Sequence, residues 1–128
     1  MRLLLDTHAF LWFIMGSVNL SVDARVLIET PTNERLLSVA SLWEIAIKTS
    51  LGKLTLSAPF DELIPAQLKL NGIELLNIKV DHLSTLTTLP FHHRDPFDRL
   101  IIAQTLVEKL SIISLDGAFD TYGVTRHW

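Results

Sequence analysis

Cysteine is missing from this chain of 128 residues. Its absence excludes disulfide frameworks, thiolate zinc sites and cysteine nucleophiles. It also agrees with a reducing, cytoplasmic location. Any chemistry that the chain performs therefore falls to its histidine, aspartate and glutamate side chains.

Positive charge is also in short supply, with 11 Lys and Arg against 14 Asp and Glu and a net charge of −3. No basic surface of the usual nucleic-acid-binding kind is expected from this balance. A site that binds phosphate would need another source of positive charge. Hydrophobic residues make up 48% of the chain and its mean hydropathy is +0.34, which excludes disorder and leaves room for apolar surface that a partner covers.

Long hydrophobic runs are lacking as well. The stretch from Met1 to Gly16 is apolar, but Asp6 and His8 interrupt it and it is too short to span a bilayer. We therefore expect neither a signal peptide nor a membrane segment. The length of the chain favours a single domain over residues 1–128.

Short apolar runs alternate with segments of helical period along the chain. The pattern predicts strands at 2–5, 35–39, 73–78 and 112–115, with a possible last strand near Val124, and helices at 7–15, 21–31, 41–51, 59–70, 81–88 and 95–110. Strands that alternate with helices imply right-handed crossovers and helices on both faces of a sheet. The predicted fold is an α/β/α sandwich with a mostly parallel central sheet, whose ligand site lies beyond the carboxyl ends of the strands.

Two acidic residues follow predicted strands directly, Asp6 after the first and Asp116 after the fourth. In a parallel sheet both carboxylates would lie at the same edge. Each residue has an alternative interpretation as the N-cap of the following helix.

Glu44 also has both a structural and a functional interpretation. Ser41 and Glu44 have the S-x-x-E spacing of a capping box, and Lys48 stands four residues further on, where it can pair with Glu44. The preceding strand nevertheless ends at the same edge as the strands before Asp6 and Asp116. Glu44 is therefore a candidate for the same site.

The sequence Asp95-Pro96-Phe97-Asp98 begins the clearest helix. Asp95 at the N-cap and Pro96 at the first helical position account for the helix start. Asp98 is then left to project toward the sheet edge, although an acidic side chain in the first turn also interacts favourably with the helix dipole.

Four converging carboxylates suit a hard divalent cation, Mg²⁺ or Mn²⁺. Such a cation removes the repulsion between the acids and provides the missing positive charge. It can activate water for attack on a phosphodiester. The five histidines lack the spacing of a zinc site, and we interpret them as surface or outer-sphere groups.

Several motifs, in order along the chain, resemble the PIN-domain proteins of the VapC toxin type. They are Leu3-Leu4-Leu5-Asp6-Thr7-His8, Ser41-Leu42-Trp43-Glu44, the specific block from His92 to Gln104, and Ser114-Leu115-Asp116. The resemblance implies a Mg²⁺- or Mn²⁺-dependent ribonuclease that acts on RNA. It also implies a small VapB-type antitoxin as partner, and a homodimer. The family's four acidic positions fall on Asp6, Glu44, Asp98 and Asp116, with Asp120 as the alternative for the last, and Ser114 stands where the family commonly has Thr.

Further candidates surround this proposed site. Lys48, Arg94 and Arg99 are close enough in sequence to the acids to contact RNA phosphates, and each has an alternative interpretation as a solvated surface charge. An apolar groove for an antitoxin helix is expected from two helices, lined by Leu11, Trp12, Met15, Trp43, Ile47 and Leu51.

Two other functions compete with the nuclease. A catalytically silent PIN-fold module would only bind a partner helix through the apolar groove. A phosphatase with Asp6 as nucleophile is disfavoured, because such sites use a second Asp two positions later, where this chain has His8, and no phosphate-binding loop is present.

Overall fold

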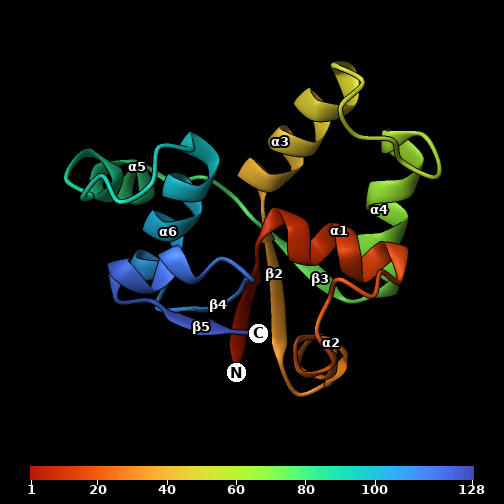
Figure 1. The fold of residues 1–128 in the computed structure, drawn as a ribbon, viewed down its shortest axis with the longest axis horizontal. Helices are drawn as coiled ribbons and strands as arrows, with labels where there is room; N and C mark the ends of the chain where they lie inside the picture. The colour runs from red at the N-terminus through yellow and green to blue at the C-terminus, as the bar shows by residue number, and fades with distance from the viewer.

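The computed structural model describes all residues 1–128, and its centre is a five-stranded parallel sheet (Figure 1). The strands are β1 (Arg2–Leu5), β2 (Glu34–Ser38), β3 (Ile73–Leu76), β4 (Ser111–Ile113) and β5 (Thr125–His127), in the order β3-β2-β1-β4-β5. Every neighbouring pair is parallel. The mostly parallel sheet predicted from the sequence is thus confirmed, and the possible last strand is present.

Helices cover both faces of the sheet. They are α1 (Thr7–Met15), α2 (Val22–Glu29), α3 (Val39–Ser50), α4 (Phe60–Leu70), α5 (Val80–Thr87), α6 (Pro96–Glu108) and the short 3₁₀ helix η1 (Gly117–Tyr122). In Figure 1, α5 and α6 lie together on one side and α4 lies on the other. None of these helices combines the length and the apolar character that crossing a membrane requires.

The alternation of side chains along β1 explains the two layers of helices. Leu3 and Leu5 pack into a core with residues of α1 to α4, whereas Leu4 packs into a second core with α6 and η1. All three leucines are fully buried, as expected for the central strand of a parallel sheet. The predicted α/β/α sandwich is therefore confirmed.

The register of the strands brings their carboxyl ends to one edge. Leu5 of β1 pairs with Leu37 of β2 and with Ile113 of β4, and the N–H of Asp6 donates to the Ile113 carbonyl at 3.1 Å. The residues that follow these strands therefore begin their helices side by side. This edge is where the sequence placed the candidate site.

Two local differences from the expected elements affect the site. Helix α3 begins at Val39, directly after β2, with Ser38 as its N-cap, instead of at Ser41. The helix η1 was not predicted, because a 3₁₀ helix of six residues is too short to give a periodic apolar pattern. Helix α1, by contrast, has its predicted bounds and ends at Gly16, whose φ of 62° suits glycine.

Candidate metal centre

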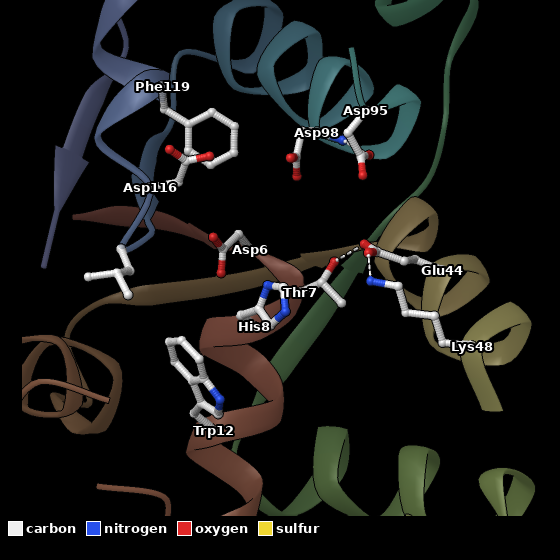
Figure 2. Close-up of a pocket in the computed structure, with 11 residues that line it drawn as sticks. Asp6, Thr7, His8, Trp12, Glu44, Lys48, Asp95, Asp98, Asp116 and Phe119 are labelled. Atoms are coloured by element: carbon white, nitrogen blue, oxygen red, sulfur yellow. Dashed lines mark hydrogen bonds and ion pairs between the residues drawn. The ribbon is translucent and has the colours of Figure 1, made fainter. Parts of the chain in front are cut away.

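A pocket of about 370 Å³ lies at the carboxyl edge of the sheet, and four separate elements contribute acidic side chains to it. Its walls include Asp6, Glu44, Asp98 and Asp116, together with Asp95. Figure 2 shows the carboxylates of Asp6, Asp98 and Asp116 facing a common space, with Glu44 further along the same pocket. The structure thus brings together all four acidic residues that the sequence singled out.

Asp6 both caps α1 and lines the pocket. Its Oδ1 accepts a hydrogen bond from the N–H of Ala9 at 2.7 Å, and the residue is buried. Burial raises the pKa of Asp6 above its ordinary value, although hydrogen bonds from Ser114 and Ala9 act in the opposite direction. Asp6 is therefore both a helix cap and a pocket residue, so the two interpretations from sequence are compatible.

Glu44 does not belong to a capping box, and that alternative is wrong. Ser38 caps α3 by accepting from the N–H of Ala40 at 3.0 Å, so Glu44 lies in the second turn, beyond the free amides. Its Oε1 accepts from Thr7 Oγ1 at 2.8 Å, and its Oε2 accepts from Lys48 Nζ at 2.6 Å (Figure 2). The predicted pair with Lys48 is present, and Thr7 ties α1 to the buried Glu44 carboxylate.

Asp98 is a second acidic residue whose pKa the pocket raises. Asp95 accepts from the N–H groups of Phe97 and Asp98 at 2.8 and 3.1 Å, which confirms it as the helix cap and leaves Asp98 in the pocket. Burial raises the pKa of Asp98 to about 7, and the nearby charges of Asp95 and Glu44 add to the increase.

Asp116, which follows β4 and caps η1, lines the pocket, and Asp120 within η1 does not. Its Oδ1 accepts from the N–H of Ala118 at 2.9 Å and its Oδ2 lies 3.1 Å from His93 Nε2. Burial alone would raise the pKa of Asp116, but the Ala118 N–H, His93 and Arg126 together lower it. Asp120 instead forms a two-pronged ion pair with Arg126, at 2.9 and 3.0 Å, on the exposed side of η1.

His93 lies beside the acidic residues, and the sequence analysis did not single it out among the five histidines. One donor atom each from His93, Asp98 and Asp116 lies within 4.8 Å of the others. The available signal was its position two residues before the cap of α6, next to the acidic block. His82, by contrast, is fully buried away from this site, where its Nε2 lies 2.9 Å from Glu108 Oε1, so the surface interpretation does not hold for it.

The three basic candidates have different surroundings. Lys48 lines the pocket through its pair with Glu44, and Arg94 is exposed and does not line it. The prediction for Arg99 is wrong. Its buried guanidinium donates to the carbonyls of Pro90 and Leu89 at 2.8 and 3.1 Å and lies against Phe91, so it holds the loop before α6 instead of facing a phosphate.

The expected apolar groove is present only in part. A groove between α1 and α3 is lined by Leu11, Trp12 and Met15, with Ile45 and Leu54 opposite them. Trp43, Ile47 and Leu51 do not line it, because they lie on another face of α3. The ring of Trp43 instead packs edge-on against Phe97 of α6, with 5.2 Å between ring centroids.

The donor set of the pocket fits a hard divalent cation. Carboxylate oxygens from three elements face one space. Burial, together with the like charges of the neighbouring acidic residues, raises the pKa of Asp98 to about 7. A cation would neutralise this repulsion, and oxygen donors are those that Mg²⁺ and Mn²⁺ prefer.

A comparison with protein-family models decides the family. The model of the PIN domain matches residues 3–124. The chain belongs to the PIN-domain family. No curated protein sequence matches this PIN domain significantly.

Solved structures share the fold at low sequence identity. The VapBC2 structure from Rickettsia felis, bound to a DNA fragment from its promoter, has a TM-score of 0.71 at 13% identity, covering 99% of this chain and 98% of that chain. FitAcB from Neisseria gonorrhoeae has a TM-score of 0.69 at 14% identity, with coverages of 98% and 96%. A toxin-antitoxin complex from Klebsiella pneumoniae has a TM-score of 0.57 at 17% identity, with coverages of 88% and 85%.

The raised pKa of Asp98 predicts how the stability of this PIN domain depends on pH. The group favours folding while it is protonated, and this contribution is lost as the pH rises from about 4 through about 7. In buffer without divalent cations, Asp98→Asn should therefore raise the free energy of unfolding at pH 8 by about 1 kcal/mol. The expected change is smaller than the free energy that corresponds to the whole pKa shift, because solvent screens the partly exposed carboxyl.

The measurement is urea unfolding of both proteins at pH 4.5 and pH 8. The difference should disappear at the lower pH. Glu74→Gln, at an exposed position in β3, is the control and should change little at either pH. Equal stability of wild type and Asp98→Asn at pH 8 would contradict the electrostatic description of the pocket.

Proposed function

We propose that this PIN domain is the toxin of a type II toxin–antitoxin system, a divalent-metal-dependent endoribonuclease that hydrolyses RNA phosphodiester bonds. The observation that carries the proposal is the single pocket in which Asp6, Glu44, Asp98 and Asp116 meet at the carboxyl edge of the sheet. PIN domains are generally metal-dependent nucleases. A cytoplasmic location and a homodimer stay predictions from the sequence.

The side chains of the pocket have distinct roles in this proposal. Asp6, Asp98 and Asp116 would hold a Mg²⁺ or Mn²⁺ ion, and Glu44 would complete the acidic set. When bound, the ion would supply Lewis-acid activation of the phosphodiester and of the attacking water. Thr7 and Lys48 fix the Glu44 carboxylate from both sides, and the Lys48 ammonium is the one cationic group of the pocket wall placed to contact a substrate phosphate.

The proposal of an antitoxin partner rests on the groove and on the neighbours in structure. The groove between α1 and α3 offers apolar side chains to a partner helix, and Met15 at its rim is about half exposed. One similar structure is described as a toxin-antitoxin complex. We infer that a VapB-type antitoxin binds this chain and places a helix in this groove.

A catalytically silent module that only binds a partner is the alternative, and the same groove favours it. Such a module would have no use for four acidic side chains in one pocket. Their mutual repulsion destabilises the fold in the absence of a cation. Metal binding therefore distinguishes the two functions.

Removal of one carboxylate charge should abolish nuclease activity. We expect Asp6→Asn and Asp98→Asn each to lower Mg²⁺- or Mn²⁺-dependent cleavage of RNA by about 100-fold or more, since the metal would lose a charged ligand. Both variants should also relieve the growth arrest that the wild-type chain causes when expressed. Asp120→Asn is the matched control, because Asp120 is paired with Arg126 outside the pocket. Full activity in both pocket variants would overturn the nuclease proposal.

Manganese should stabilise the wild-type protein against heat. At a concentration of 100 times the dissociation constant, binding to the folded state alone contributes about 2.7 kcal/mol. In differential scanning fluorimetry, Mn²⁺ should therefore raise the Tm of wild type and of Asp120→Asn. It should not raise the Tm of Asp98→Asn. A silent module would show the same Tm with and without Mn²⁺ in all three proteins.

The groove can be tested at an exposed rim residue. We expect a short reading frame for a DNA-binding antitoxin beside the gene, and Met15→Asp should weaken binding of its product by about 10-fold or more. Val18→Asp, at a side chain that is 98% exposed outside the groove, is the control. Calorimetric titration measures both affinities, and equal affinities for Met15→Asp and wild type would place the antitoxin elsewhere.

A further inference from the structure

The imidazole of His93 is held rigidly at the rim of the acidic pocket. Its ring stacks on Phe119 with 5.1 Å between centroids and an angle of 22°, and it lies 5.6 Å from the ring of Tyr122. The side chain is only 9% exposed. A ring fixed in this way loses little conformational freedom when a ligand binds to it.

The backbone that carries the ring is fixed by the same aromatic residue. The hydroxyl of Tyr122 accepts hydrogen bonds from the N–H groups of His92 and His93, at 3.0 and 2.8 Å. Tyr122 thereby joins η1 to the loop before α6. The loop thus presents His93, and not its neighbour His92, to the carboxylates of Asp98 and Asp116.

The nitrogen that faces the pocket has the surroundings of a metal ligand. His93 Nε2 lies 3.1 Å from Asp116 Oδ2, and the donor atoms of His93, Asp98 and Asp116 fall within 4.8 Å of one another. Two donors bound to one ion at about 2.1 Å lie up to about 4.2 Å apart, so small side-chain movements suffice for shared coordination. Metal binding requires the lone pair of Nε2, so the ring proton must then reside on Nδ1.

The second ring nitrogen, Nδ1, does not determine where the ring proton lies. His93 Nδ1 is buried and has no hydrogen-bond partner in the protein. No carbonyl or carboxylate therefore fixes the tautomer from behind. Without a metal, the ring can donate from Nε2 to Asp116, whereas a metal on Nε2 would place the proton on Nδ1, where the protein offers no acceptor.

We propose that His93 is a nitrogen ligand of the metal centre and makes the centre prefer Mn²⁺ over Mg²⁺. The inference rests on the proposed metal-dependent function and adds a ligand to it. Oxygen donors alone suit Mg²⁺ and Mn²⁺ alike, whereas an imidazole donor favours the transition metal. The alternative is a positioning residue, which orients the Asp116 carboxylate through the 3.1 Å contact without touching the ion.

The experiment measures metal binding to the purified 128-residue chain without RNA. Isothermal titration gives the dissociation constants for Mn²⁺ and Mg²⁺ in wild type, His93→Gln and His92→Gln. We expect His93→Gln to weaken Mn²⁺ binding by about 10-fold or more while Mg²⁺ binding changes much less, because the lost donor is a nitrogen. His92→Gln, at the adjacent exposed ring, should keep the wild-type ratio of the two constants.

Pulsed electron paramagnetic resonance of the Mn²⁺-loaded wild-type protein provides a second readout that does not depend on how a variant folds. Coupling to a directly bound imidazole nitrogen is expected, and its absence would overturn the assignment of His93 as ligand. Equal losses of Mn²⁺ and Mg²⁺ affinity in His93→Gln would also overturn it and assign a positioning role. If the wild-type protein binds neither ion, the proposed metal dependence itself is refuted. This outcome is distinct from those that overturn only the assignment of His93.

Discussion

The carboxylates of the pocket carry like charges in a confined, partly buried space, and the chain must hold them there against their mutual repulsion. The acidic residues are close together because β1, β2 and β4 are parallel and their carboxyl ends lie at one edge of the sheet. Helix N-termini offset part of the cost. Asp6 and Asp116 each use Oδ1 to accept a backbone N–H at the start of a helix, and Asp98 lies in the first turn of α6, at the positive end of its dipole. The same aspartate side chains therefore cap helices and form the pocket.

Glu44 is stabilised differently, because no helix N-terminus is available to it. Thr7 of α1 and Lys48 of α3 bond its two oxygens, and Thr7 Oγ1 also lies 3.0 Å from Ser41 Oγ. These bonds connect α1 and α3, the two helices that border both the pocket and the apolar groove. A partner seated in the groove would therefore lie next to Thr7 and Lys48, the side chains that orient Glu44, because both residues line the groove as well as the pocket.

The sequence was sufficient to predict those features that depend on local burial and spacing. The strands β1 to β4 and the bounds of α1 follow from apolar runs and turn residues, and Asp95 could be separated from Asp98 because a cap and Pro96 leave one acid unused. The start of α3 was misplaced because Ser38 and Ser41 are both competent caps, and only the direct passage from β2 into the helix decides between them.

The surroundings of Arg99 and His93 could not be predicted, because they depend on how the loop before α6 folds back and on contacts with η1. The guanidinium of Arg99 is taken up by carbonyls of the preceding loop, and His93 is held by Phe119 and Tyr122 of a 3₁₀ helix that the sequence pattern does not reveal.

The net negative charge of the chain has a different meaning once the pocket is located. Removing Asp6, Glu44, Asp98 and Asp116 from the 14 acidic residues leaves ten, against 11 Lys and Arg, so the rest of the chain is close to neutral. The repulsion that a polyanionic substrate would meet is therefore concentrated at the pocket. A divalent cation held there would change the charge at that same point and attract a phosphodiester to it. The proposed nuclease function is therefore compatible with the acidic balance of the chain, because metal binding and attraction of the substrate would take place in the same pocket.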